Sequence, residues 1–257
     1  STLRLLLPAL ATLFAFVSQP QAAEEFSAGQ ADGGWEFTIS PYLWAAGIKG
    51  RTGTLPGLPA ADVDESFGDI FDDLRMSAML FYSARKGRFG ISGDLEYVET
   101  VAKDNALAPL FGREELTSKS FILSAVGEYL AYDDGRSVLR LSVGARLWSV
   151  DTELELSNGL LPGRRIKGDK TWVDPVLGVS GILGLGQKTF LRGWGYVGGF
   201  GVGSDFTADV FLGLGYRFTD SVSSTLGYRW VKVDYESNDF LYDVRQEGIA
   251  TGLSFTF

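Results

Sequence analysis

The last nine residues of the chain, from Ile249 to Phe257, alternate between apolar side chains and small or polar ones. Successive side chains of a β-strand point to opposite faces, so this segment has one apolar face and one small, polar face. That combination suits a wall with lipid outside and a crowded polar interior. We therefore predict that the chain ends in a strand of a transmembrane β-barrel. An amphipathic strand of a soluble sheet is the alternative.

The start of the chain has the layout of a secretory signal peptide. Arg4 is the only charge before Glu24, residues 5–17 are largely apolar, and small or polar residues follow. The apolar run is shorter than the roughly 20 residues that a helix needs to cross a bilayer. We predict cleavage after Ala23, with Ala22 nearly as good. The expected segments are a signal peptide at 1–23, a short periplasmic segment at 24–34 and the barrel at 35–257.

Composition excludes several classes of function. The chain has no histidine and no cysteine, which removes histidine-based triads, thiol catalysis and thiolate metal sites. Its formal net charge of −9 repels nucleic acid, so no nucleic-acid partner is expected. Asp94 and Glu96 could in principle act as an acid–base pair, but we expect them to form ion pairs with arginine. We therefore predict that the protein is not an enzyme.

Alternation and turn signals predict an all-β, antiparallel, up-and-down transmembrane β-barrel of about ten strands, with eight or twelve as alternatives. On the clearest strand, Leu212 is expected to face lipid and Phe211 to face the lumen. The strands are expected at 35–49, 74–85, 88–101, 117–132, 138–154, 167–184, 189–199, 206–218, 222–235 and 242–257.

The connections between these strands alternate between short turns and long loops. If Phe257 ends in the periplasm, the short turns are periplasmic and the long loops are extracellular, as in outer-membrane barrels. The first loop is open to two interpretations. It holds either an extra hairpin, which gives twelve strands, or a short acidic helix over the mouth of the barrel. The long loops are expected at 50–73, 102–116, 155–166, 200–205 and 236–241.

The predicted strand faces project a nearly balanced set of charges into the lumen. The basic members are all arginine, which binds carboxylates through two parallel hydrogen bonds. Narrow barrels fill their own interior and buried charges need partners, so we expect a packed network. A selective pore or a ligand pocket is the alternative. The predicted luminal network is Arg85, Asp94, Glu96, Arg140, Arg146, Asp174, Arg192, Asp209, Arg217 and Arg229, and Glu36, Arg75 and Glu128 also project inward.

The first long loop carries a dense group of carboxylates. Carboxylates bind hard cations, so Ca²⁺ or Mg²⁺ could bind there, although the spacing does not fit an EF-hand. A solvated surface loop is the alternative, and no other cofactor is expected. The candidate metal-binding residues are Asp62, Asp64, Glu65, Asp69, Asp72 and Asp73.

Four stretches together resemble one family. They are S-P-Y-L-W-A-A-G at 40–47, W-V-D-P-V-L-G at 172–178, G-G-F-G-V-G-S at 198–204 and L-G-Y-R-W-V-K-V-D-Y at 226–235. With Phe255 and Phe257, which resemble the C-terminal assembly signal of outer-membrane barrels, they resemble an uncharacterised group of proteobacterial outer-membrane β-barrel proteins. More distantly, the chain is similar to the small OmpA- and OmpW-like barrels.

The resemblance implies a location in the Gram-negative outer membrane. It also implies contact with outer-membrane lipid and lipopolysaccharide, and with the barrel-assembly machinery during insertion. It leaves the oligomeric state open. We expect a structural or surface barrel with at most a narrow pore. The alternative is a porin-like or OmpW-like barrel that transports or binds small or hydrophobic solutes.

Overall fold

The computed structural model describes residues 34–104 and 110–257. The predicted signal peptide, its cleavage point and nearly all of the predicted periplasmic segment lie outside the described residues. Within the described residues, no helix reaches the length and apolar character needed to cross a membrane.

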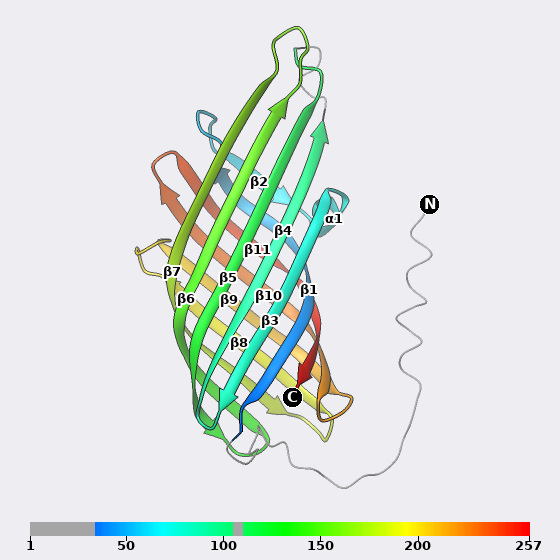
Figure 1. Cartoon of the computed structure of the whole chain (residues 1–257), viewed down its shortest axis with the longest axis vertical. Helices are drawn as coiled ribbons and strands as arrows, with labels where there is room; N and C mark the ends of the chain where they lie inside the picture. The colour runs from blue at the N-terminus through cyan, green and yellow to red at the C-terminus, as the bar shows by residue number, and fades with distance from the viewer. Residues whose placement is uncertain (1–33, 105–109) are drawn as a thin grey trace, which may run out of the picture.

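The chain forms a closed antiparallel β-barrel (Figure 1). Consecutive strands pair with one another around the wall, and β11 returns to pair with β1, so the ten-stranded barrel predicted from the sequence is confirmed. β2 is an additional strand that, within residues 34–104 and 110–257, pairs only with the end of β1. The elements are β1 Glu36–Gly53, β2 Ala61–Glu65, α1 Phe67–Asp72, β3 Leu74–Lys86, β4 Phe89–Asp104, β5 Glu114–Asp133, β6 Ser137–Leu156, β7 Arg164–Gly184, β8 Thr189–Gly199, β9 Phe206–Arg217, β10 Val222–Ser237 and β11 Phe240–Thr256.

The two ends of the barrel differ. One end, here called the turn end, holds the connections that follow β3, β5, β7 and β9. The barrel also closes there through a hydrogen bond of 2.9 Å from the Phe37 amide to the Phe257 carbonyl oxygen. The opposite end, the loop end, holds the remaining connections. There β5, β6 and β7 rise above their neighbours because they are 20 to 21 residues long (Figure 1).

Two loops differ from the prediction. Residues 236–241 were expected to form a long loop, but β10 and β11 extend into it and leave a turn of Asn238 and Asp239. Asn238 has a φ of 53°, a left-handed conformation that asparagine tolerates and that permits the tight turn. The first loop holds both β2 and the predicted short helix, α1. It contains no hairpin that would widen the barrel to twelve strands.

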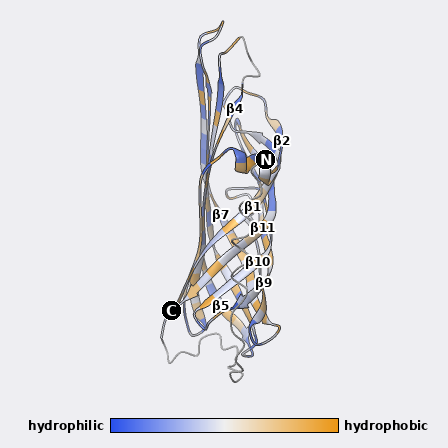
Figure 2. Ribbon diagram, turned by 90° about the vertical axis from the view of Figure 1, so that its right-hand side faces the viewer, coloured by the Kyte–Doolittle hydropathy of each residue, from blue (hydrophilic) through white to orange (hydrophobic). Residues whose placement is uncertain are grey.

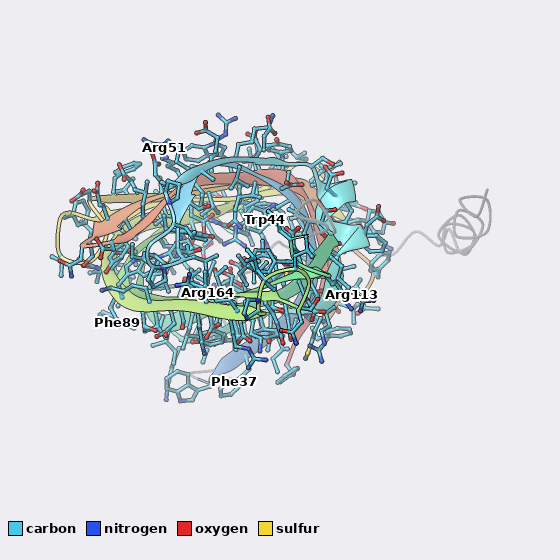
Figure 3. The ribbon with its side chains drawn as sticks, turned by 90° about the horizontal axis from the view of Figure 1, so that it is seen from above. Phe37, Trp44, Arg51, Phe89, Arg113 and Arg164 are labelled. Carbon is cyan, nitrogen blue, oxygen red and sulfur yellow. The ribbon has the colours of Figure 1, made fainter. Side chains whose placement is uncertain are left out.

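The predicted strand faces are confirmed except at Arg75, which lies at a register shift in β3. Phe37 and Leu43 are exposed on the outer wall, whereas Trp44 is buried inside; Figure 3 shows Trp44 within the ring of strands and Phe37 outside it. On β9, Leu212 is 62% exposed and Phe211 is 5% exposed, as their alternation predicts. On β8 the inward face is identified by Phe190, which is buried in the interior.

The alternation between apolar and polar side chains reverses toward the loop end. On β6 the outward side chains are apolar or small from Leu139 to Leu147 and acidic from Asp151, while the inward ones change from Arg146 to Trp148 and Val150. Hydrophilic colours accordingly dominate the upper ends of the long strands (Figure 2). The turn-end half is therefore built for lipid outside, and the loop-end half for water outside and an apolar core inside. Outer ion pairs cover the water-facing part, at 3.0 Å each for Asp151–Lys167, Glu153–Arg165 and Glu155–Arg165.

Candidate functional site

The middle of the lumen holds five charged side chains, here called the central ion cluster: Asp94, Glu96, Arg146, Asp209 and Arg229. Arg229 donates two hydrogen bonds to the Asp209 carboxylate, from Nε to Oδ1 at 3.1 Å and from Nη2 to Oδ2 at 2.7 Å. Its Nη2 also lies 3.0 Å from Asp94 and 2.8 Å from Glu96. Arg146 donates to the same Asp209 oxygen at 2.7 Å. Strands β4, β6, β9 and β10 are thus tied together across the barrel.

Neutral side chains complete the hydrogen bonding of this cluster. The Tyr42 hydroxyl donates to Asp94 at 2.8 Å and accepts from Arg229 at 3.0 Å. The Trp194 indole donates to Asp209 at 2.9 Å. Asp209 therefore accepts from three side chains while only 1% exposed, and such satisfaction is what makes a buried charge tolerable.

Above the central ion cluster, toward the loop end, aromatic side chains fill the barrel. We call Trp148, Trp172, Tyr235, Phe240 and Tyr242 the aromatic cap. Trp172 is its centre: its ring stacks on Tyr235 at 4.0 Å and on Trp148 at 5.8 Å, and it meets the other two edge-on. Stacked and edge-on contacts at these distances add to the stability that burial alone gives.

Toward the turn end, the lumen widens into a cavity of about 410 Å³, here called the luminal cavity. It extends from the central ion cluster to residues 219–221 of the β9–β10 turn. Among its lining charges, Arg85 binds Glu128 through two hydrogen bonds of 2.8 and 3.4 Å. Arg140, Arg192 and Arg217 line the same cavity. The predicted charges thus fall into two groups, at the centre and at the turn end.

Two charged residues that were predicted to face the lumen, Asp174 and Arg75, belong to neither of these two groups. Asp174 stands opposite Arg146 in the β6–β7 ladder, yet its oxygens accept from the Ser204 amide at 2.6 Å and the Ser204 hydroxyl at 2.8 Å. It therefore anchors the β8–β9 loop. Arg75 lies at a register shift in β3, which takes it out of the alternation; it pairs with Glu99 at 3.1 Å and its side chain is 67% exposed.

The stretches that carry the family resemblance meet inside the barrel. Trp172 donates from its indole to Ser204 at 2.8 Å, so the segments 172–178 and 198–204 are bonded to each other. Trp44 lies under the Arg229 guanidinium at 4.7 Å, which joins 40–47 to 226–235. These segments therefore build the closed interior.

The wall has a discontinuity between β1 and β3. Their ladder stops at Pro41, which has no N–H to donate, and β1 next meets β2 at Ile48. Across residues 42–47, β1 pairs on its β11 edge only. A mostly apolar cavity of about 430 Å³ lies at this place, here called the side cavity, with inward residues such as Met79 and Ile122 and outward ones such as Leu43.

The six acidic residues of the first loop are not gathered at one point. Asp62 and Asp64 pair along β2 with Arg51 at 3.9 Å and Lys49 at 3.0 Å. Asp69 caps α1: the amide and hydroxyl of Ser66 donate to it and hold its pKa below the ordinary value. Glu65 ends β2, and Asp72 and Asp73 close α1. Within residues 34–104 and 110–257, no group of three or more candidate ligands is placed to hold a metal ion, and Ca²⁺ or Mg²⁺ binding stays a prediction.

The aromatic cap was not predicted from the sequence. Its members were assigned to strands or loops, but their gathering into one core was missed. The signal available in the sequence was the exchange of apolar and polar faces toward the loop end. On β10 the inward Val231, Val233 and Tyr235 are apolar, while the outward Lys232 and Asp234 are charged.

No family model matches the chain, and no curated protein matches it. Among solved structures, the translocator domain of autotransporter NalP from Neisseria meningitidis is 12% identical, covers 89% of this chain and 90% of that one, and gives a TM-score of 0.52. The outer membrane protease OmpT from Escherichia coli is 11% identical, covers 87% of this chain and 96% of that one, and gives a TM-score of 0.51. At such identities the likeness concerns the fold alone: this chain has the fold of outer-membrane β-barrels.

Proposed function

We propose that this protein is an integral outer-membrane β-barrel with a structural or surface role and at most a narrow pore. The observation that carries the proposal is the filled middle of the lumen, where the central ion cluster and the aromatic cap succeed each other along the axis. Arg229 is 2% exposed and Trp148 is fully buried. Open aqueous pores belong to barrels of about sixteen strands, whereas barrels near eight strands fill themselves. A non-catalytic role fits the absence of histidine and cysteine from the sequence.

Planar-bilayer recording tests the closed lumen. We expect small and rare conductance steps from the wild type. Trp148→Ala combined with Trp172→Ala removes two stacked rings from the aromatic cap and should raise conductance, provided that heat-dependent gel mobility shows a folded barrel. Leu141→Ala, on the outer wall, is the matched control and should leave conductance unchanged. Steady, ion-selective conductance of the wild type would contradict the proposal, because the lumen would then be a working pore.

Membrane location and orientation are tested on cells. We expect the protein in the outer-membrane fraction, and recovery only from the soluble periplasm would overturn the assignment. Epitope tags at Pro56 and Asn158, at the loop end, should be accessible on intact cells. Tags at Gly135 and Asp220, at the turn end, should not. The opposite pattern would place the turn end outside.

Binding of a hydrophobic ligand is a second candidate function, and the discontinuity between β1 and β3 favours it. Backbone without strand partners is expensive at membrane depth and is tolerated where it lines a cavity. The side cavity lies at that place, with Leu43 and Ile249 on its lipid-facing rim and Met79 and Ile122 inside. A ligand in the outer leaflet would thus meet an apolar recess without passing through the lumen.

Photolabelling tests this second candidate. A photoreactive alkane dissolved in vesicles that contain the barrel should label inward residues such as Met79 and Ile122. Ala46→Trp, which fills the side cavity, should reduce this labelling. Ala125→Trp, on an exposed outward position, should leave it unchanged. Labelling confined to outward residues would show that the side cavity takes no ligand from the bilayer.

A further inference from the structure

Within the described part of the chain, two arginines in the luminal cavity bind no carboxylate. Arg140 is 7% exposed, and its Nη1 has no hydrogen-bond partner among the residues that the structure describes. Arg192 donates to the Ser254 hydroxyl at 3.2 Å and lies over the Phe190 ring at 5.5 Å. Both partners of Arg192 are uncharged. The turn-end half of the lumen therefore holds guanidinium groups whose charge is not neutralised by direct contact.

The carboxylates nearest to this place are already bonded elsewhere. Glu128 accepts two hydrogen bonds from Arg85 and one from the Ser92 hydroxyl, at 2.7 Å. Glu36 lies 4.0 Å from the same Arg85. The charged groups that act on Arg140 are Arg85, Glu128, Glu36 and Asp133, whereas Arg85 is the charged group that acts on Arg192. The charged neighbour of Arg192 is therefore another cation, and the carboxylates that act on Arg140 are bonded to other groups, Asp133 to the Gly135 amide at 2.9 Å.

The strand order places the two arginines close together on the wall of the cavity. Arg140 on β6 is paired with Ser180 of β7, and Arg192 on β8 is paired with Ile182 of β7. The two arginines are therefore separated by one intervening strand, or about 10 Å between strand axes, and both line the luminal cavity. Long side chains at that spacing can reach a small molecule from two sides.

An unpaired buried charge costs several kcal/mol, so a partner is expected where the chain supplies none. We propose that the luminal cavity binds a phosphate group between Arg140 and Arg192. Guanidinium groups recognise phosphate oxygens through pairs of hydrogen bonds. A tetrahedral dianion presents oxygens in more than one direction and matches two positive charges that approach from different strands. The cavity volume of about 410 Å³ falls in the range of small-molecule sites.

Titration calorimetry with inorganic phosphate on the purified barrel in nonionic detergent tests the site, at constant ionic strength maintained with chloride. We expect saturable binding to the wild type. Arg140→Ala and Arg192→Ala should each weaken it at least about tenfold, as the loss of a charge-assisted pair predicts. Arg136→Ala, at an exposed arginine in the turn beside Arg140, is the matched control and should bind within about twofold of the wild type.

Folding must be separated from binding. Heat-dependent gel mobility shows whether each variant is a folded barrel, and Arg140→Lys, which keeps the charge but loses the planar fork, should fold and bind more weakly than the wild type. Equal binding by folded Arg140→Ala, Arg140→Lys and wild type would overturn the proposal. So would the absence of any phosphate binding to the wild type.

The phosphate group could belong to a soluble molecule or to a lipid headgroup, and reconstitution separates the two. In vesicles of phosphate-free glycolipid, added phosphate should raise the unfolding temperature of the wild type but not of Arg140→Ala. If the source is a lipid headgroup, phospholipid vesicles should give that rise without added phosphate. If neither condition raises it, the luminal cavity has no phosphate site. The outcome is independent of conductance, so it does not depend on the proposed closure of the lumen.

Discussion

Removal of the Arg229 guanidinium should destabilise the barrel more than any change on its outer charged surface. Arg229→Met keeps a side chain of similar length but leaves Asp94, Glu96 and Asp209 with Arg146 as the remaining cation of the central ion cluster. Removing one partner of a buried ion pair typically costs about 3–5 kcal/mol, because the other charge stays buried without compensation. We expect a loss in that range in the free energy of unfolding.

Urea unfolding of the barrel in detergent micelles measures this loss. Arg245→Met is the control, since Arg245 is exposed and pairs with Glu247 at 3.2 Å, and an exposed pair contributes about 0–1 kcal/mol. A double-mutant cycle isolates the fork between Arg229 and Asp209. With Asp209→Asn as the second change, the coupling should be about 2–3 kcal/mol. A loss under about 1 kcal/mol for Arg229→Met would refute the view that Arg229 compensates buried negative charge in the central ion cluster.

Three further predictions follow from other parts of the fold. Leu212→Arg places a charge on the lipid-facing wall and should lower the free energy of unfolding by about 2–4 kcal/mol if residue 212 lies near the bilayer midplane. Leu212→Ala should lower it by less. Equal unfolding curves for the two variants would show that this wall does not face lipid. Gly203→Ala should displace the Ser204 loop, because a Cβ there would lie 2.5 Å from the Val173 carbonyl oxygen and 2.6 Å from an Asp174 oxygen. The refolding yield of this variant should therefore fall. Gly195→Ala is the control and should refold normally, because the space around its Cβ is open. The Asp134 carboxylate accepts hydrogen bonds from the amides of Arg136 and Ser137, which lower its pKa. These bonds therefore stabilise the turn fully above the ordinary aspartate pKa of about 4, and the stabilisation is lost as the pH falls through the lower pKa of the folded state. An NMR titration that gives Asp134 an ordinary pKa would contradict this prediction.

The barrel could be predicted from the sequence because its elements are set by local periodicity. Each strand carries its own two-residue alternation, and glycine- or aspartate-containing turns separate neighbours at the turn end. Up-and-down order then follows without any long-range choice. The short turn at Asn238 was missed because its flanking strands lie above the lipid-facing band, where the outward Glu236 and the inward Phe240 no longer follow the apolar-outward rule.

The interior could be predicted in content but not in pairing. The alternation places Asp94, Asp209 and Arg229 inside, yet which of them touch depends on how strands on different sides of the ring face each other, and periodicity carries no such information. Asp174 illustrates the limit: it points inward as predicted, but the β8–β9 loop folds in and supplies its partner, Ser204. The prediction for Arg75 fails for another reason: the register shift between Leu74 and Met76 removes this one residue from the regular alternation of β3.

The reversal of polarity along the wall restrains the molecule along the bilayer normal. If the barrel slid inward, the acidic ladder that begins at Asp151 would enter hydrocarbon, where charges are penalised increasingly with depth. If it slid outward, the apolar band that includes Leu141 and Val143 would be wetted, at about 25 cal/mol for each Å² exposed. Both displacements raise the free energy, so the immersion depth is held between two opposing gradients encoded in the same strands. The loop-end half is consequently kept out of the hydrocarbon by the same strands that cross it.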